Sequence, residues 1–367
     1  MNRLLLALAL ATCAPLAAAQ IVIGQTAGFS GPEAATVKDS TEGAKLYFER
    51  VNAAGGVNGQ KIELVSMDDR LDPKLAADNA RKLITDSNAL ALFLSRGTAP
   101  TSAIQPLLAE HKVPLVAPST GAMALRAPVQ PWIFHARAPY QRETEKAVQH
   151  LLTTGVTRIA LAHVDDAFGA DAAAGVLRGV DRGRQRTAFV LKWKGDKPDM
   201  TPIVAGVTKL DIQALVLIGP APAVADGIRQ LRGKGAKTTV VTTSNNASPE
   251  FIKLLGDAGR GVIVTQVVPF ERSSAAPIVK EAYDLAAAKG ISEVTPAMLE
   301  GFAGAKVLVE GLKRAGPKPT RQKLRDALDA IGRADIGGIE VKYSAQDHTG
   351  IEYTDLSIIG PDGRFHR

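Results

Sequence analysis

The sequence predicts an α/β protein built from two doubly wound parallel-sheet lobes. Short runs rich in β-branched residues recur along the chain and alternate with stretches of helix length. This alternation predicts parallel sheets covered by helices on both faces. Two such units fit, one before and one after about residue 140, and no linker rich in Pro, Gly or Ser separates them. The missing linker favours lobes joined by several chain crossings over domains joined once.

The order of elements follows from apolar runs and from turn residues. A strand at 21–24 leads through a Gly-Phe-Ser-Gly-Pro loop into an amphipathic helix that includes 43–52, and a Gly-rich turn at 55–59 closes this helix. Two last strands, 337–341 and 353–359, are expected around an Asp-His-Thr-Gly turn at 347–350. Further strands are predicted at 62–65, 89–94, 114–117, 158–163, 188–193, 214–218, 238–242 and 261–267, and helices at 73–85, 141–154, 169–179, 223–233 and 296–315.

Residues 1–19 have the pattern of a signal peptide. A positive Asn-Arg start precedes an apolar core at 4–11, and Ala-Ala-Ala at 17–19 supplies a small-residue cleavage site. The apolar core is too short to span a membrane. We therefore expect an exported, periplasmic protein whose only cysteine, Cys13, leaves with the signal. An alternative is a lipoprotein anchored at Cys13, because residues 10–13 approximate a lipobox, although Thr12 stands where a smaller residue is usual.

Composition and motifs argue against several function classes. The formal net charge of +7 is spread along the chain without basic runs interleaved with aromatic residues, so nucleic acid is not an expected partner. The sequence has no phosphate-binding loop, nucleophile elbow or zinc-protease motif. Gly24 and Gly28 lack the dinucleotide-binding spacing, and the six histidines do not cluster. We expect no cofactor, no metal and no enzymatic activity.

Polar residues follow two neighbouring strands of the first unit, where open α/β sheets bind ligands. Thr98 lies at the start of a predicted helix, and its hydroxyl and the free N–H groups there suit a carboxylate. Ser119, Thr120 and Gly121 follow the next strand and present two hydroxyls and a turn backbone. Alternatively, Thr98 only caps its helix, and Ser119 and Thr120 only form a turn.

The order of parts from residue 21 to 73 resembles the start of the branched-chain amino-acid-binding (leucine-binding-protein-like) family, the extracytoplasmic solute receptors of ABC importers. The resemblance covers nearly the whole mature chain and implies the type I periplasmic binding protein fold, in which a three-segment hinge joins the lobes. Carried onto this chain, lobe 1 is 21–138 plus 270–334 and lobe 2 is 139–269 plus 335–367. The crossings then fall near Arg137, Val268 and Ile336.

The resemblance also implies a ligand site between the lobes. Thr98, Ser119, Thr120 and Gly121 match positions that hold the ligand carboxylate and part of its ammonium group. Lobe 2 offers an aromatic wall of Tyr140, just past the first crossing, and Phe168, although either could be ordinary core. Of the two, Phe168 matches a family pattern in which an aromatic residue before Gly covers the ligand. A departure is the loop at 243–249, where amino-acid binders usually carry an acidic residue for the ammonium; this chain has Asn245 there. Thr36 stands about where some members place an aromatic residue.

These features predict a receptor that binds a small carboxylate-bearing ligand and delivers it to an ABC permease in the inner membrane. Amino acids, aromatic acids and amides all remain candidate ligands, because a neutral Asn245 cannot cancel the charge of an ammonium. We expect a monomer. The alternatives are a sensor that presents its bound state to a membrane receptor and, less favoured because no nucleophile and base pair is evident, an exported hydrolase.

Overall fold

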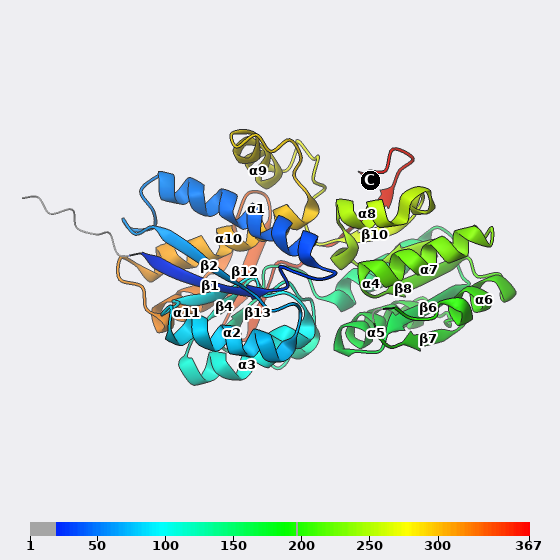
Figure 1. Ribbon diagram of the computed structural model, residues 1–367, viewed down its shortest axis with the longest axis horizontal. Coiled ribbons are helices and arrows are strands. Elements are labelled where there is room, and N and C mark those ends of the chain that lie inside the picture. Colours follow the sequence, from blue (N-terminus) through cyan, green and yellow to red (C-terminus); the bar gives the residue numbers. More distant parts are fainter. Residues whose placement is uncertain (1–19, 196) are drawn as a thin grey trace, which may run out of the picture.

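The computed structural model describes residues 20–195 and 197–367 of the protein. The predicted signal peptide and Cys13 lie outside these described residues. Figure 1 shows two lobes side by side, with α1 and α10 in one and α4 to α8 in the other. None of the helices in the described ranges combines the length and the apolar character needed to cross a bilayer.

The first lobe is built on a five-stranded sheet in the order β2-β1-β3-β4-β5, in which every pairing is parallel. Apart from the edge strand at 62–68, its strands are almost fully buried, as expected for a sheet covered on both faces. The strands are β1 (Ile21–Ala27), β2 (Ile62–Asp68), β3 (Ala91–Phe93), β4 (Leu115–Val116) and β5 (Ile133–Phe134), and the helices are α1 (Ala34–Ala53), α2 (Pro73–Thr85), α3 (Thr98–His111), η1 (Met123–Leu125), α9 (Pro277–Ala287), α10 (Pro296–Ala315) and α11 (Arg321–Asp329).

The second lobe has a seven-stranded sheet in the order β15-β14-β10-β9-β8-β6-β7. The pairings are parallel from β10 to β7, whereas β14 and β15 add as antiparallel edge strands. The strands are β6 (Ile159–Val164), β7 (Val190–Trp193), β8 (Ala214–Ile218), β9 (Thr239–Thr242), β10 (Ile263–Gln266), β14 (Asp355–Ile359) and β15 (Phe365–His366), and the helices are α4 (Tyr140–Thr153), α5 (Ala167–Arg182), α6 (Thr201–Lys209), α7 (Ala221–Gly233), η2 (Ser244–Asn246), α8 (Pro249–Leu255) and η3 (Gly256–Gly259).

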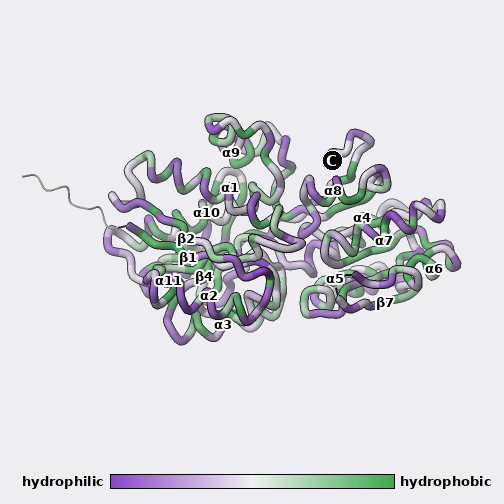
Figure 2. Tube along the Cα trace, viewed as in Figure 1, coloured by the Kyte–Doolittle hydropathy of each residue, from purple (hydrophilic) through white to green (hydrophobic). Residues whose placement is uncertain are grey.

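Helices α1 and α10 make the closest helix contact of the first lobe. A Cβ on Gly43 would overlap the carbonyl of Met298, and a Cβ on Gly301 would overlap the carbonyl of Ser40. The two glycines therefore let the helix backbones approach each other directly. Because α10 follows the second lobe in the sequence, the core of the first lobe is assembled from distant parts of the chain. Figure 2 shows hydrophobic and hydrophilic stretches alternating along the helices of both lobes.

The C-terminal region differs from the sequence-based expectation. Residues 347–350, expected as a turn, form strand β13 (Asp347–Gly350), which pairs with β12 (Glu340–Ser344) beside β11 (Gly332–Asp335). This small sheet packs on the first lobe, because Val341 and Tyr343 join its core and His135 donates its backbone N–H to His348 O at 2.9 Å. The third crossing therefore lies between β13 and β14 and not near Ile336.

Candidate ligand-binding site

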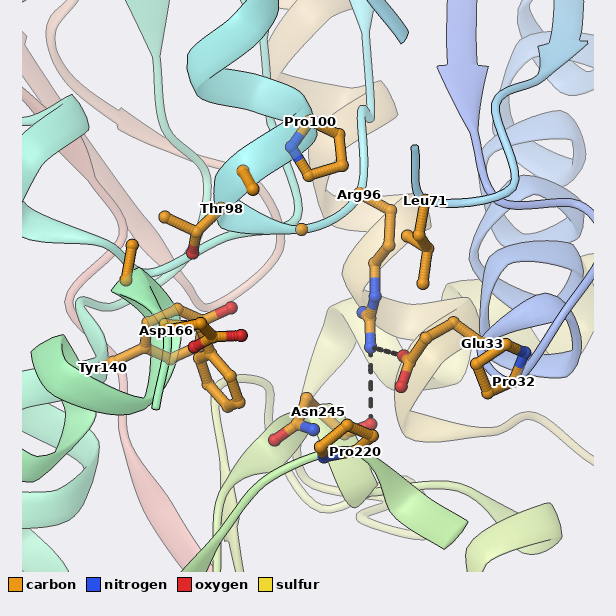
Figure 3. Close-up of a pocket in the computed structure, with 14 residues that line it drawn as sticks. Pro32, Glu33, Leu71, Arg96, Thr98, Pro100, Tyr140, Asp166, Pro220 and Asn245 are labelled. Atoms are coloured by element: carbon orange, nitrogen blue, oxygen red, sulfur yellow. Dashed lines mark hydrogen bonds and ion pairs between the residues drawn. The ribbon is translucent and has the colours of Figure 1, made fainter. Parts of the chain in front are cut away.

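A cavity of about 270 Å³ lies between the two lobes and takes its walls from both. In Figure 3 Thr98, Tyr140 and Asp166 lie on one side of it, and Arg96 with Glu33 lies on the other. The first lobe contributes Pro32, Glu33, Leu71, Arg96, Gly97, Thr98, Ala99 and Pro100, and the second contributes Tyr140, Asp166, Ala167, Phe168, Pro220 and Asn245.

The wall residues come together because they follow the carboxyl ends of parallel strands. Arg96 and Thr98 follow β3, Asp166 follows β6, and Pro220 follows β8. The carboxyl ends of parallel strands meet at one edge of a sheet, and open α/β sheets bind ligands there. Both lobes turn this edge towards the cavity, so loops far apart in the sequence face one another.

The start of helix α3 supplies free hydrogen-bond donors. The backbone N–H groups of Thr98 and Ala99 have no intrahelical acceptor, because they belong to the first turn of the helix. Pro100 has no N–H, and the Thr101 N–H donates to Gly97 O at 3.2 Å. Gly97 has a φ of 87°, which a glycine adopts without strain and which sets the entry into the helix. The two free N–H groups and the helix dipole suit a carboxylate.

The loops after β3 and β4 lie against each other. Each begins with a non-glycine residue in the left-handed region, Leu94 at φ 51° and Ala117 at φ 54°. Such residues are uncommon and cluster at functional sites. The Ser119 N–H donates to Ser95 O at 2.7 Å, and the Gly97 N–H donates to Ser119 O at 3.3 Å. This pairing fixes the position of the α3 N-terminus.

Thr120 and Gly121 lie directly behind the cavity wall. The Thr120 hydroxyl is hydrogen-bonded to the Thr98 hydroxyl at 2.9 Å. Gly121 accepts a hydrogen bond from the Tyr140 N–H at 3.0 Å, and a Cβ at this position would run into the Tyr140 backbone. These residues position Thr98 and Tyr140, which themselves face the cavity.

Tyr140 and Phe168 form an aromatic wall in the second lobe. Their rings meet edge to face with centroids 4.8 Å apart. The Arg137 guanidinium lies 5.0 Å from the centroid of the Tyr140 ring, a cation–π arrangement. Burial raises the pKa of Tyr140, so its hydroxyl is protonated at neutral pH. The wall offers an apolar surface with one polar tip.

A buried ion pair closes the opposite side of the cavity. Arg96 Nη2 lies 2.6 Å from Glu33 Oε2, and it reaches Asn245 O of the second lobe at 3.4 Å. Arg96 Nη1 donates to Ser119 Oγ at 2.9 Å, and Ser119 Oγ donates to Glu300 Oε1 at 2.8 Å. Burial disfavours the charged form of Arg96, but Glu33 and Glu300 outweigh burial and raise its pKa.

Arg137 continues this chain of charges across the hinge. Its Nη1 lies 3.3 Å from Glu300 Oε1, and its Nη2 lies 2.5 Å from Glu143 Oε1. Glu143 is fully buried and also accepts from Thr265 Oγ1 at 2.6 Å and from the Ser244 N–H at 3.2 Å. Burial opposes the charge on Arg137, but Glu300 and Glu143 raise its pKa. Carboxylates and guanidinium groups thus alternate from one lobe to the other.

Asn245 and Thr36 have different positions relative to the cavity. Asn245 lines it, and its side chain is held within the second lobe, where Nδ2 donates to Gly219 O at 3.1 Å and Oδ1 accepts from Thr243 Oγ1 at 2.5 Å. Thr36 instead lines a separate, much smaller cavity beside Gln266. The loop around Asn245 carries no acidic residue, but Asp166 and Glu33 bring carboxylates to the main cavity from elsewhere.

Four of the eight residues predicted for the site line the main cavity: Thr98, Tyr140, Phe168 and Asn245. Their contacts with a ligand, like those of Ser119, Thr120, Gly121 and Thr36, stay predictions. Sequence reasoning missed Arg96, Glu33 and Asp166 as wall residues. Arg96 and Asp166 stand in loops already singled out, so a charged side chain next to a predicted binding residue was the available signal. Within the described ranges no group of three or more His, Cys, Asp or Glu side chains could hold a metal ion.

A family model described as "Periplasmic binding protein" matches residues 20–358. The chain belongs to the periplasmic binding protein family. Among the solved structures similar to this family member is a substrate-binding periplasmic protein from Ralstonia solanacearum, 33% identical, with a TM-score of 0.85 over 94% of this chain and 99% of that one. A "Periplasmic binding Protein Type 1" from Bordetella pertussis, 20% identical, has a TM-score of 0.83 over 95% and 99% of the two chains and shows the same fold.

Curated relatives of this periplasmic binding protein include the Leu/Ile/Val-binding protein of Escherichia coli (strain K12), which is 26% identical over 71% of this chain and 72% of the relative. A leucine-, isoleucine-, valine-, threonine- and alanine-binding protein of Pseudomonas aeruginosa is 26% identical over 90% and 88% of the two chains. The predicted family and the predicted type I fold are confirmed. The protein is a solute-binding protein and not an enzyme.

Proposed function

We propose that this protein is a periplasmic receptor that binds a small carboxylate-bearing ligand between its lobes and delivers it to an ABC permease in the inner membrane. The observation that carries the proposal is the α3 N-terminus, where the Thr98 hydroxyl and two free backbone N–H groups face a cavity shared by both lobes. A helix N-terminus favours an anion, and Tyr140, packed edge to face on Phe168, stands across the cavity from Arg96. The relatives that bind amino acids support the same ligand size and charge.

Closure of the lobes links binding to delivery. The ligand contacts residues of both lobes, so its affinity for the closed form exceeds its affinity for the open form and shifts the hinge equilibrium. Cross-lobe contacts such as Arg96 to Asn245 O and Arg137 to Glu143 add to the closed form. A permease that recognises the paired lobe surfaces then receives the loaded state and not the empty one.

The experiment is a thermal-shift screen of small carboxylates, followed by solution scattering with the best ligand. A cognate ligand at 100 times its dissociation constant should stabilise the protein by about 2.7 kcal/mol. The radius of gyration should fall when the ligand is added. A tight ligand that leaves the scattering profile unchanged contradicts the hinged-receptor proposal. Ligand uptake into cells that depends on both this protein and a permease tests the delivery step.

A further inference from the structure

The Arg96–Glu33 pair gives the cavity a polar end. Arg96 and Glu33 have side chains that are 7% and 11% exposed, and both line the cavity. Figure 3 shows them meeting across the cavity from Tyr140 and Asp166. A buried ion pair is weak support for stability, because a well-packed apolar pair often does as well. Its position in a ligand cavity therefore calls for a reason other than folding.

Both members of the pair have unused hydrogen-bonding capacity. Within the described residues three N–H donors of Arg96 are used, by Glu33, Ser119 and Asn245 O, and this leaves further guanidinium donors. Glu33 uses Oε2 for Arg96, whereas its Oε1 has no protein partner in the described ranges. Water satisfies these groups while the cleft is open, and a ligand that closes the cleft must replace that water.

The side chain of the ligand decides whether the replacement succeeds. A hydrocarbon group against Arg96 and Glu33 would leave their free donors and acceptor buried without partners. Sites built to hydrogen-bond a substrate group reject an analogue that lacks it by factors of up to about 10⁴ to 10⁵. The pair is neutral as a whole, so a neutral group that both donates and accepts fits without leaving an unpaired charge.

We propose that the ligand carries, besides its carboxylate, a carboxamide or hydroxyl group that is bound by the Arg96–Glu33 pair. The inference rests on the proposed function, in which the α3 N-terminus holds the carboxylate. It makes Arg96 and Glu33 determinants of specificity. It also separates this ligand from leucine, isoleucine and valine, which the name of the Escherichia coli relative gives and whose side chains are pure hydrocarbon.

The test uses ligands matched in shape. Leucine, asparagine and aspartate differ in a hydrocarbon, amide or charged end, and 4-methylbenzoate, 4-hydroxybenzoate and benzene-1,4-dicarboxylate repeat the series on an aromatic ring. Calorimetry on the exported protein should show the amide or hydroxyl member binding at least about tenfold tighter than its methyl-ended partner in one set. Equal or tighter binding of the hydrocarbon member overturns the inference. Tightest binding of the doubly charged member overturns the choice of a neutral group.

Variants connect the preference to the pair. The double variant Arg96→Met with Glu33→Leu removes both charges together. It should lower the affinity for the polar ligand about tenfold or more and raise the affinity for its hydrocarbon partner. Glu33→Gln keeps the side-chain shape and should lower the affinity for the polar ligand alone. This single variant tests the role of the pair if the double variant does not fold. An unchanged preference in a folded variant overturns the role of the pair.

Thr98→Val separates failure of this inference from failure of the proposed function. All members of a set share the carboxylate, so this change should weaken each of them by a similar factor. A uniform loss without any polar preference leaves the proposed function standing and overturns only the inference. No binding by any member of either set, to the wild type or to a variant, overturns both.

Discussion

Thr98 and Thr120 share a hydrogen bond between their hydroxyl oxygens at 2.9 Å, although 22 positions separate them in the sequence. Thr98 faces the cavity, whereas Thr120 is fully buried behind it. Thr98 can therefore contact the ligand, while Thr120 holds the Thr98 side chain in place. This arrangement supplies a matched pair of variants for the carboxylate site.

Thr98→Val should cost about 1.5 to 3 kcal/mol of ligand affinity, because it removes a hydroxyl aimed at a charged group while keeping the side-chain shape. Thr120→Val removes the same internal hydrogen bond without removing a cavity hydroxyl, so affinity should fall by less. Calorimetry and urea unfolding of both variants give the two quantities. If Thr98 is only structural, the two variants will lose similar stability and neither will lose affinity.

Asn245→Asp should lower the free energy of unfolding by about 1 to 3 kcal/mol, because a carboxylate oxygen would replace the amide that donates to Gly219 O. Urea unfolding without ligand measures this loss. Asn246→Asp is the control, since Asn246 also donates to Gly219 O, at 3.2 Å, but does not line the main cavity. Both variants should lose stability.

Only Asn245→Asp should change the ranking of ligands. A new negative charge at the cavity should weaken a purely anionic ligand and preserve or improve binding of an α-amino acid, whose ammonium it attracts. Dissociation constants for one ligand of each kind give the sign. The same shift in Asn246→Asp, or none in Asn245→Asp, contradicts a direct role of position 245 in recognising the ligand's charge.

Arg137→Met should destabilise the protein by about 3 to 5 kcal/mol, because Glu143 and Glu300 lose the cation that they share in a buried site. Arg142→Met is the control: Arg142 pairs with Glu352 at 3.1 Å, with both side chains more than half exposed, and its loss should cost less than about 1 kcal/mol. Urea unfolding at neutral pH compares them. Equal losses would show that the hinge network contributes no more than a surface pair.

Stability should fall as the pH drops below 6.5, through His135. Burial first, and then the neighbouring charge of Arg126, holds the pKa of His135 well below 6.5 in the folded protein. As the pH falls through 6.5, His135 is protonated in the unfolded chain but stays neutral in the folded protein. This contribution to stability is therefore complete above pH 6.5 and is lost as the pH falls below it. Unfolding from pH 5 to 8 should show this slope, and His135→Gln should reduce it. An unchanged slope would assign the effect to other groups.

The alternation of elements was predictable because parallel strands buried on both faces appear in the sequence as apolar runs. The position of the third chain crossing between the lobes was not predictable from the sequence. Residues 347–350 contain turn-forming residue types, and only pairing with β12 makes them a strand. For the site, Thr98 and Phe168 could be placed because they follow predicted strands. The partnership of Arg96 with Glu33, 63 positions away, depends on tertiary packing that one sequence does not encode locally.

The contact between α1 and α10 has a consequence for the order of events during biogenesis. Gly301 and its helix are synthesised after the whole of residues 139–269, so the nascent first lobe cannot cover α1 until the second lobe has been made. An apolar helix face and much of a sheet stay uncovered during that interval, which favours slow folding and association with other chains. Export of the chain before it folds, as a signal peptide would direct, moves that vulnerable interval out of the crowded compartment in which the chain is made.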